Sequence, residues 1–216
     1  MRVFEIFESI NGEIASKHQG SLCTFIRLSG CNLKCSYCDT KKSQDPSAGK
    51  EMAMEEVIQS VIDLGNTNVT ITGGEPLTQK EELLLLAQIL FLRQFDISIE
   101  TNGSIEIPNS WFVESWVADW KLPSSGMTDQ MDLLNFASLS RKDIIKFVIQ
   151  DRRDFEAAME IVKIVEKKPS PPLFAFSPCF GQAEPLEIIK WMQKENILKR
   201  RGSIFNYQIH KIINVA

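Results

Sequence analysis

The sequence has no excess of positive charge and no basic stripe. Its 24 lysine and arginine residues are outnumbered by 28 aspartate and glutamate residues, which gives a net charge of −4 and a pI near 5.4. Proteins that follow a phosphate backbone concentrate lysine and arginine on one face or along one helix. We therefore expect no nucleic-acid partner.

The sequence also lacks a long apolar run. Its longest apolar stretch, residues 83–92, is interrupted by Gln88 and bounded by Glu82 and Arg93, which is far short of the roughly 20 residues that a membrane-spanning helix needs. The first eight residues alternate in polarity and carry two acids, unlike the continuous apolar core of a signal peptide. We expect neither a membrane span nor export.

No low-complexity linker and no internal repeat divides the chain. The densest proline cluster, residues 168–172, is only long enough to return a helix to a strand. A chain of 216 residues with 44% apolar content can bury a full core. We therefore expect one domain over residues 1–216.

Cysteine occurs in an odd number and is unevenly distributed. Three of the five cysteines, Cys31, Cys35 and Cys38, have the spacing C-x3-C-x2-C, which a disulfide scaffold would not favour in a chain this long. This usage predicts a cytoplasmic protein in a reducing compartment. Cys23 and Cys179 are expected to be small core residues rather than metal ligands, because free cysteine is among the most often buried types.

Short apolar runs rich in valine, isoleucine and phenylalanine alternate with stretches of helical periodicity. This alternation is typical of parallel strands joined by crossover helices. Strands are predicted at residues 3–7, 23–28, 69–72, 97–100, 116–120, 144–149, 173–176 and 207–212, and helices at residues 54–64, 81–93, 129–136, 154–167 and 185–195. Because the helices are too few for eight complete units, the pattern predicts an α/β fold with an incomplete, TIM-like β/α barrel of mostly parallel strands.

The cysteine triplet has one thiolate too few to saturate a cubane iron–sulfur cluster. Four thiolates would close a 4Fe-4S cluster into an electron carrier, whereas three leave one iron free to bind and activate another molecule. Lys34 and Arg27 lie nearby in the sequence, and positive charge favours ionised thiolates. The alternative is a structural zinc site completed by Cys179, His18 or His210 in a zinc-stabilised binding module, because structural zinc takes four protein ligands.

A second motif, Thr72-Gly73-Gly74-Glu75-Pro76-Leu77, directly follows a predicted strand. Paired glycines let a backbone approach a ligand closely, and catalytic groups of such folds gather where parallel strands end. The carboxylate of Glu75 could accept hydrogen bonds from a cationic amine, such as that of S-adenosylmethionine. A Gly-Gly turn by itself is an ordinary turn, so this interpretation depends on the cysteine triplet.

Together, the triplet and residues 73–76 resemble the radical S-adenosylmethionine (radical SAM) superfamily. The resemblance implies a 4Fe-4S cluster on the three cysteines whose open iron chelates S-adenosylmethionine, and an enzyme that generates a 5′-deoxyadenosyl radical. An alternative within the superfamily is an activase that abstracts hydrogen from a glycine of a partner protein. The sequence has no additional cysteine-rich segment of the kind that activases commonly carry.

Segments spread over the chain resemble a narrower family, the 7-carboxy-7-deazaguanine synthases. These segments are residues 7–13, 25–30, 38–40, 100–103, 121–126, 176–178 and 208–211. The resemblance implies conversion of 6-carboxy-5,6,7,8-tetrahydropterin to 7-carboxy-7-deazaguanine and ammonia, a radical ring contraction on the route to queuosine. It also implies a magnesium ion, an external electron donor of the flavodoxin or ferredoxin type, and a homodimer.

The same resemblance assigns contacts to individual residues, with no catalytic residue beyond the cluster and the cofactor. Thr40 would ligate magnesium beside the substrate carboxylate, and Arg27 offers a fork for that carboxylate. The remaining substrate contacts are Ile10, Asn11, Gly12, Thr72 and, on the last predicted strand, His210. The cofactor contacts are Tyr37, Cys38, Asp39, Gly73, Gly74, Glu75, Lys121, Ser177, Pro178, Cys179, Phe180 and Glu100, which holds either a ribose hydroxyl or the substrate amine.

The entrance loop departs from the family pattern. The family has Gln-Gly-Glu-Gly where this chain has Asn11-Gly12-Glu13-Ile14. Asparagine keeps both a donor and an acceptor but reaches one methylene less far. Isoleucine cannot adopt positive φ cheaply, so we expect a different loop conformation after Glu13.

Overall fold

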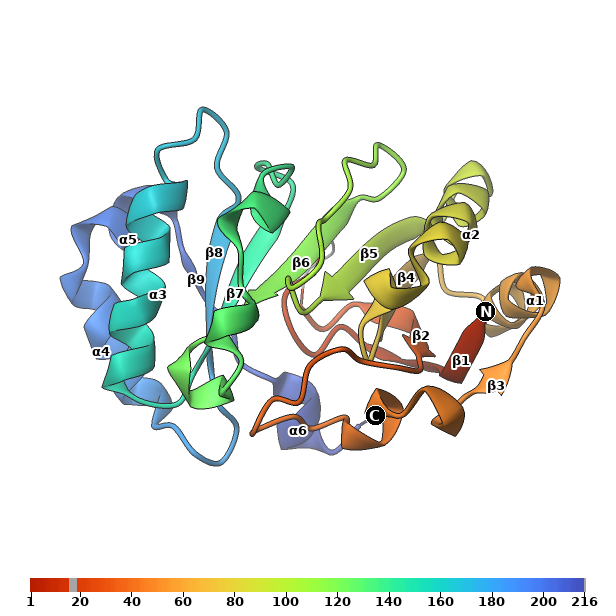
Figure 1. Cartoon of the computed structure of the whole chain (residues 1–216), viewed down its shortest axis with the longest axis horizontal. Helices are drawn as coiled ribbons and strands as arrows, with labels where there is room; N and C mark the ends of the chain where they lie inside the picture. Colours follow the sequence, from red (N-terminus) through yellow and green to blue (C-terminus); the bar gives the residue numbers. More distant parts are fainter. Residues whose placement is uncertain (16–18, 216) are drawn as a thin grey trace.

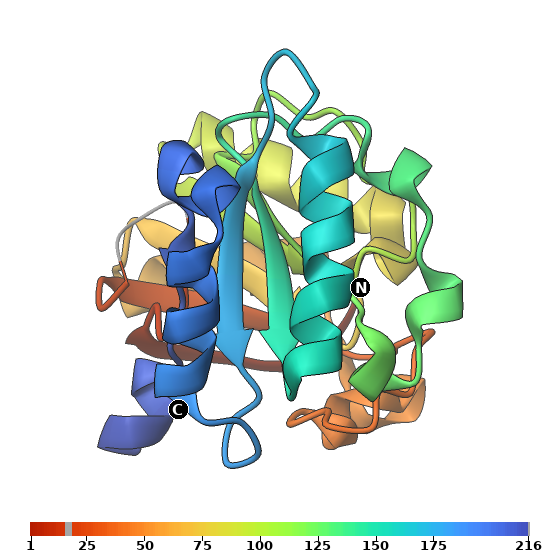
Figure 2. The same ribbon diagram turned by 90° about the vertical axis from the view of Figure 1, so that its left-hand side faces the viewer.

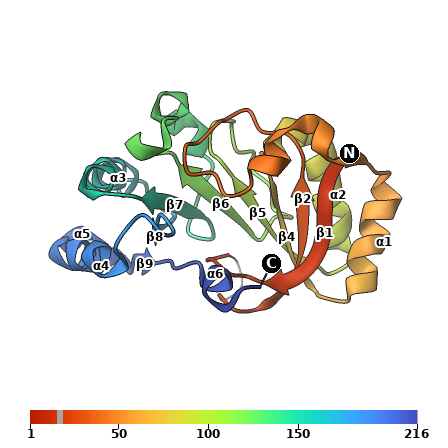
Figure 3. The ribbon, with the colours of Figure 1, turned by 90° about the horizontal axis from the view of Figure 1, so that it is seen from below.

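The chain folds around one mixed sheet that curves into an open barrel (Figure 1, Figure 3). Within residues 1–15 and 19–215, the ranges that this computed structural model describes, nine strands form the sheet in the order β3-β1-β2-β4-β5-β6-β7-β8-β9. The strands are β1 (Arg2–Ile10), β2 (Leu22–Leu28), β3 (Lys50–Glu51), β4 (Asn68–Gly73), β5 (Asp96–Thr101), β6 (Ser115–Trp120), β7 (Ile144–Ile149), β8 (Leu173–Pro178) and β9 (Ile204–Phe205). Neighbours from β2 to β9 are parallel, and β1 pairs antiparallel with β2 and β3. The predicted incomplete barrel is confirmed.

Helices cover the outer face of this sheet, and Figure 2 shows α3 and α4 in front of the sheet, running alongside β7 and β8. The helices are α1 (Met54–Leu64), α2 (Lys80–Leu92), α3 (Arg152–Val165), α4 (Pro185–Lys194), α5 (Asn196–Arg201) and α6 (Ile209–Ile213), with 3-10 turns η1 (Lys41–Gln44), η2 (Pro46–Ala48), η3 (Pro76–Gln79), η4 (Pro123–Ser125), η5 (Thr128–Gln130) and η6 (Leu133–Phe136). Helix α3 begins where the Asp151 side chain accepts a hydrogen bond from the Asp154 N–H, a typical N-cap. Across the described ranges, no helix is long and apolar enough to span a membrane.

The two faces of the sheet differ in polarity, because successive strand residues point to opposite sides. One set packs against the helices and forms the main core: Val69, Ile71, Ile97, Ile99, Trp116, Ala118, Ile145, Phe147, Ile149, Phe174 and Phe176. Burying each large apolar side chain contributes about 1.5–3 kcal/mol. The alternate set faces the barrel interior and is largely polar: Thr70, Thr72, Ser98, Glu100, Asp119, Lys146 and Ser177. A polar interior next to the strand ends is suited to binding a ligand rather than to filling a core.

Ile14 packs against a small apolar cluster of the sheet. The cluster consists of Val117, Ile144 and Ala175, and the Ile14 N–H donates a 2.8 Å hydrogen bond to Asn206 Oδ1. Ile14 is not among the described non-glycine residues with positive φ. Isoleucine at this position therefore packs in an apolar cluster and has no left-handed backbone strain.

Two predicted elements are wrong. Residues 207–212 are not a strand, because β9 ends at Phe205 and the segment turns into α6 after the Ile209 N–H bonds to Gly12 O. Residues 129–136 form η5 and η6 instead of a helix, because Asp132 caps a new turn by accepting from the Leu134 N–H. The other predicted strands and helices are confirmed, with ends that differ by at most three residues.

Candidate active site

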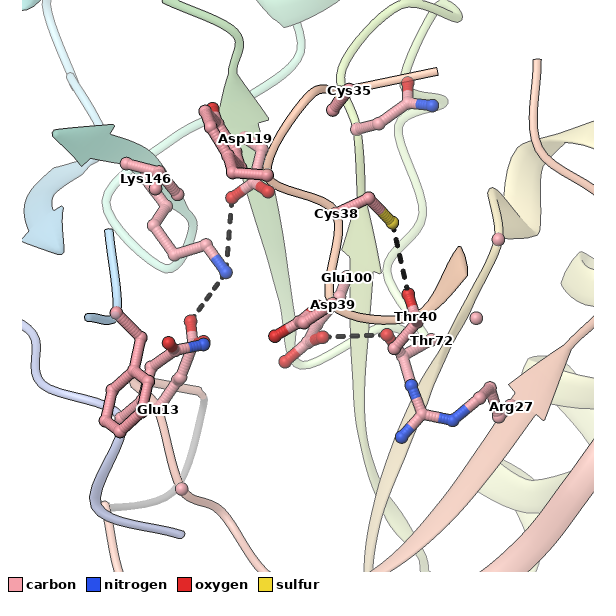
Figure 4. Close-up of a pocket in the computed structure, with 18 of the residues that line it drawn as sticks. Glu13, Arg27, Cys35, Cys38, Asp39, Thr40, Thr72, Glu100, Asp119 and Lys146 are labelled. Atoms are coloured by element: carbon pink, nitrogen blue, oxygen red, sulfur yellow. Dashed lines mark hydrogen bonds and ion pairs between the residues drawn. The ribbon is translucent and has the colours of Figure 1, made fainter. Parts of the chain in front are cut away.

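A cavity of about 430 Å³ lies on the inner side of the sheet, at the carboxyl ends of the parallel strands (Figure 4). Its walls come from the loop between β1 and β2, the loop after β2, the ends of β4 to β7, and the segment that contains α6. Most of the predicted site residues line it: Asn11, Gly12, Arg27, Cys31, Cys35, Tyr37, Cys38, Asp39, Thr40, Thr72, Gly73, Gly74, Glu100, Lys121, Cys179, Phe180 and His210. The strand-end location of the site is the one expected for parallel β/α folds.

The loop after β2 brings the three cysteines to this cavity as free thiols. Backbone hydrogen bonds fold the loop: Gly30 N–H donates to Ser43 O at 2.8 Å, and Cys38 N–H donates to Cys35 O at 3.3 Å. A further bond from Ser36 N–H to Ser125 O at 3.0 Å ties the loop to η4. The peptide framework thus presents three sulfur ligands from one short segment.

The donor set fits a cubane cluster better than a single metal ion. Among the described residues, no three Cys, His, Asp or Glu side chains converge on the position of one ion, as the four ligands of structural zinc do. A cubane instead takes each thiolate on a separate iron. Of the proposed additional zinc ligands, Cys179 and His210 line the cavity, and His18 lies outside the described residues.

Burial raises the pKa of the Cys31 and Cys35 thiols, so that coordination to a metal is needed to hold them as thiolates. The cation that opposes this shift at Cys35 is Lys121. Lys34, predicted to have this role, is exposed. Its side chain is solvated, which weakens its effect on the thiols.

The paired glycines bring two backbone segments into contact. Gly73 has φ +139°, and a Cβ there would lie 2.2 Å from Leu28 O, while a Cβ on Gly74 would lie 2.0 Å from Gly30 O. The segments are joined by hydrogen bonds from Gly74 N–H to Leu28 O at 3.0 Å and from Glu75 N–H to Gly30 O at 2.7 Å. The glycines thus hold the cysteine loop against the end of β4, and approach to a ligand is not their only role.

Glu75 does not line the cavity, and internal donors take up its carboxylate, so its predicted contact with a cofactor amine stays a prediction. The side chain is fully buried. Its Oε1 accepts from Leu77 N–H at 2.9 Å and from the Thr101 hydroxyl at 2.8 Å, and its Oε2 accepts from Asn102 N–H at 2.6 Å. Asn102 Nδ2 in turn lies 3.7 Å from Cys31 Sγ. Burial raises the pKa of Glu75 and the three hydrogen bonds oppose that shift, so the carboxylate serves as an internal clamp.

Ile10, Ser177 and Pro178 are not among the residues that line this cavity, and their predicted ligand contacts stay predictions. Ile10 pairs with Leu22 in the β1–β2 ladder. The buried Ser177 hydroxyl accepts a 2.8 Å hydrogen bond from Asn206 Nδ2. Pro178 is the last residue of β8. The three residues are adjacent in sequence to residues of the site, but they take part in strand pairing and in hydrogen bonds within the protein.

Several charged residues that sequence reasoning missed line the cavity: Glu13, Asp119, Lys146 and Lys211. Lys146 Nζ lies 2.6 Å from Glu13 Oε2 and 3.2 Å from Asp119 Oδ1 (Figure 4). Lys211 pairs with Asp39. Burial disfavours the charged form of Lys146, but Asp119, Glu13 and Glu100 raise its pKa well above the ordinary value. The sequence did contain a signal for Lys146: it is a lysine within the apolar strand 144–149, and buried lysine is rare unless it is paired.

Arg27 and Glu100 offer opposite charges to a ligand. Arg27 Nε donates to Glu5 Oε1 at 2.8 Å and its guanidinium lies 5.5 Å from the Phe7 ring centroid, so these contacts orient the group through one edge. Glu100 Oε2 accepts from the Thr72 hydroxyl at 2.8 Å. Within the described ranges no lysine or arginine forms an ion pair with Glu100, and burial raises its pKa.

The entrance loop meets α6 at the cavity. A Cβ on Gly12 would lie 1.8 Å from His210 Nδ1, so only glycine permits this contact. Asn11 Oδ1 accepts a 3.0 Å hydrogen bond from Thr70, while Asn11 Nδ2 and His210 Nδ1 are buried without a partner among the described residues. Burial lowers the pKa of His210, so a neutral imidazole and an amide remain for a ligand. His210 lies on a helix rather than the predicted strand.

This combination of an open β/α barrel and three cysteines at its ligand cavity defines an iron–sulfur enzyme of the radical SAM class. The model of the Radical SAM superfamily matches residues 25–181, and the chain belongs to this superfamily. Membership implies a 4Fe-4S cluster and S-adenosylmethionine as cofactors, which the cysteine donor set fits.

Within that superfamily, the chain belongs to the 7-carboxy-7-deazaguanine synthase family. A protein of that name from Clostridium acetobutylicum is 39% identical over 216 residues, which cover 98% of this chain and 95% of the relative. Another from Koribacter versatilis is 32% identical and covers 99% and 96%. A crystal structure of QueE from Escherichia coli matches with a TM-score of 0.75 at 22% identity, over 95% of this chain and 92% of that one, which shows the shared fold. The predicted family is confirmed.

Proposed function

We propose that the protein converts 6-carboxy-5,6,7,8-tetrahydropterin to 7-carboxy-7-deazaguanine and ammonia, in queuosine biosynthesis. The observation that carries this proposal is Arg27, which lies in the same cavity as the cysteine triplet and has its guanidinium oriented by Glu5 and Phe7. A guanidinium binds a carboxylate through two parallel hydrogen bonds. The full-length similarity to the named synthases supports the same reaction.

The polar groups around the cavity suit the opposite end of such a substrate. A tetrahydropterin carries amine and amide N–H donors and a ring carbonyl. Glu100, held by Thr72, can accept hydrogen bonds from these donors, and Asn11 Nδ2, which has no partner among the described residues, can donate one to the carbonyl. When bound, the cluster and S-adenosylmethionine supply the 5′-deoxyadenosyl radical. The chain's own residues fix the substrate relative to that radical.

The direct test is turnover by the anaerobically reconstituted protein. We expect 7-carboxy-7-deazaguanine, detected by mass spectrometry, when reductant, S-adenosylmethionine, magnesium and the carboxytetrahydropterin are present.

Arg27→Gln should raise the KM for the carboxytetrahydropterin about tenfold or more, because the substrate carboxylate loses its charge-assisted partner, while the cluster absorbance stays unchanged. Cleavage of S-adenosylmethionine without any deazapurine product would refute the proposed substrate.

We also propose that Thr40 ligates a magnesium ion that bridges to the substrate carboxylate. Thr40 precedes η1, but among the described residues its side chain makes no capping hydrogen bond. Its Oγ1 faces the cavity, 3.7 Å from Cys38 Sγ. Magnesium takes oxygen ligands and keeps several waters, so one protein hydroxyl is a reasonable share of its shell.

Thr40→Ala should increase the magnesium concentration needed for half-maximal activity by about tenfold, because one oxygen ligand is lost. Iron content should remain at the wild-type value. Thr40→Ser keeps the hydroxyl and should keep the magnesium requirement. An unchanged magnesium titration for Thr40→Ala would remove Thr40 from the metal site.

The remaining assignments extend the family resemblance. We propose an electron donor of the flavodoxin or ferredoxin type. Lys34, Lys41 and Lys42 are exposed around the cysteine loop, and their positive charge would attract an acidic donor.

A homodimer is proposed from the resemblance alone. A reducing cytoplasmic compartment is supported by the need to keep three ligand thiols reduced, and one domain over residues 1–216 by the single sheet.

A further inference from the structure

A chain of four charges with alternating sign crosses the barrel interior. It consists of Glu13, Lys146, Asp119 and Lys121, which we call the inner charge chain (Figure 4 labels the first three). Lys146 Nζ lies 2.6 Å from Glu13 Oε2 and 3.2 Å from Asp119 Oδ1, and Lys121 Nζ lies 2.7 Å from Asp119 Oδ2. The Lys146 and Glu13 side chains are only 10% and 14% exposed, so water screens these contacts weakly.

One end of the inner charge chain holds the entrance loop. Glu13 follows Asn11 and Gly12, which line the cavity. Besides Lys146, the Glu13 carboxylate accepts hydrogen bonds from Gln208 Nε2 and, at 3.4 Å, from Asn206 Nδ2. Glu13 therefore joins the entrance loop to the segment that leads into α6.

The other end of the inner charge chain reaches the cysteine loop. Lys121 follows β6 and lies just before η4. The η4 carbonyls of Ser124 and Ser125 accept hydrogen bonds from Ser36 Oγ at 2.6 Å and from Ser36 N–H at 3.0 Å. Ser36 lies between two of the cluster cysteines. A shift of η4 would therefore move the cysteine loop as well.

Lys146 is the link between the two ends. It is the cation shared by Glu13 and Asp119, whereas Asp119 retains Lys121 as a second partner. Without the Lys146 ammonium, Glu13 would keep only neutral amide donors in a mostly buried position. An uncompensated buried carboxylate moves toward water or toward another cation, and either movement carries Asn11 and Gly12 with it.

We propose that Lys146 is a positioning residue that fixes the entrance loop and the end of β6 together, so that substrate and S-adenosylmethionine favour each other's binding. This inference rests on the proposed function. Lys146 does not serve as the receptor of the substrate carboxylate, because its ammonium is already shared by two carboxylates. By thermodynamic linkage, the two ligands must strengthen each other's affinity by the same factor.

The test measures binding rather than turnover. Reconstituted enzyme with an oxidised cluster and no reductant is titrated anaerobically with the carboxytetrahydropterin, with and without S-adenosylmethionine, by calorimetry. In the wild type, S-adenosylmethionine should lower the substrate Kd about fivefold or more. Lys146→Met should raise the substrate Kd about tenfold or more and remove most of that effect, while Lys146→Arg should restore part of both.

Lys168→Met is the matched control. Lys168 also has its ammonium taken up by the protein, through the carbonyls of Phe136, Ala137 and Leu139, but it does not line the cavity. Its loss should lower the Tm and leave both Kd values unchanged. If Lys146→Met does not fold, the double variant Glu13→Gln with Lys146→Met removes the pair together, and it should show the same loss of coupling between the two ligands.

The outcomes separate this inference from the proposed function. A wild type that does not bind the pterin would overturn both. A wild type that binds it, together with a folded Lys146→Met or double variant that keeps the coupling, would overturn the positioning role alone. The same loss of affinity in Lys168→Met would also overturn it, because general destabilisation would then account for the effect.

Discussion

Gly74→Ala should yield a protein that neither retains an iron–sulfur cluster nor turns over substrate. A Cβ at this position would lie 2.0 Å from Gly30 O, 2.5 Å from Gly30 C and 2.9 Å from Ser43 O. All three atoms belong to the backbone, so no side chain can rotate away. The hydrogen bond from Glu75 N–H to Gly30 O, 2.7 Å long, must break as well. We expect a loss of about 2–4 kcal/mol in stability and a displaced cysteine loop.

Iron content and the absorbance near 400 nm after anaerobic reconstitution measure this effect directly. Gly65→Ala is the control: unlike Gly74, Gly65 has a positive φ, +77°, but a Cβ added there would meet no atom of the described residues within 4 Å. That variant bears only the cost of the left-handed backbone, about 1 kcal/mol, and should bind iron normally. Equal iron content in Gly74→Ala and the wild type would show that the contact between the two loops is not needed to hold the cluster.

The cysteine loop and most elements could be predicted because their signals are local. The C-x3-C-x2-C spacing places three thiols on one short segment whatever surrounds it. The strand at 144–149 and the helix at 54–64 were predicted with the observed bounds, since β-branched runs and a 3.6-residue apolar period report directly on local structure. Strand ends then place the motifs at one edge of the sheet.

Glu75 and Lys146 show where that local information stops. Their partners are distant in sequence: Glu75 bonds Thr101 and Asn102, and Lys146 pairs with Glu13, 133 residues away. In the sequence, a carboxylate beside two glycines is typical of a ligand-binding group. Only the fold shows that Glu75 has hydrogen-bond donors within the protein. A lysine in an apolar strand likewise has no evident role until two acids from other segments meet it.

The prediction of a strand in the C-terminal segment was wrong for a related reason. Residues 207–210 alternate in polarity like a strand, but the Ile209 N–H donates to Gly12 O and His210 packs against Gly12. A tertiary contact thus decides between strand and helix where the local preference is weak. The same contact places His210 at the cavity, on a helix instead of the predicted strand.

Glu75→Gln should destabilise the protein by about 3 kcal/mol although it changes only one atom. Both carboxylate oxygens accept from backbone N–H groups, Oε1 from Leu77 and Oε2 from Asn102. An amide has one oxygen and one NH2 group, so either orientation of glutamine places an NH2 group against an N–H donor. Thr101 can rotate its hydroxyl to accept, but the backbone donors cannot.

The Tm of Glu75→Gln should therefore fall by roughly 6–12 °C for a chain of this size, and iron retention should fall with it, because Asn102 also contacts Cys31 Sγ. Glu156→Gln is the matched control: Glu156 is 64% exposed and pairs with Arg152 on the surface of α3, so its loss should cost less than about 1 kcal/mol. If Glu75→Gln kept the wild-type Tm while losing S-adenosylmethionine affinity, the clamp would be refuted and direct contact with the cofactor amine would stand. A lower Tm with lost iron would instead place Glu75 in the support of the cysteine loop, which is the role its three hydrogen bonds define.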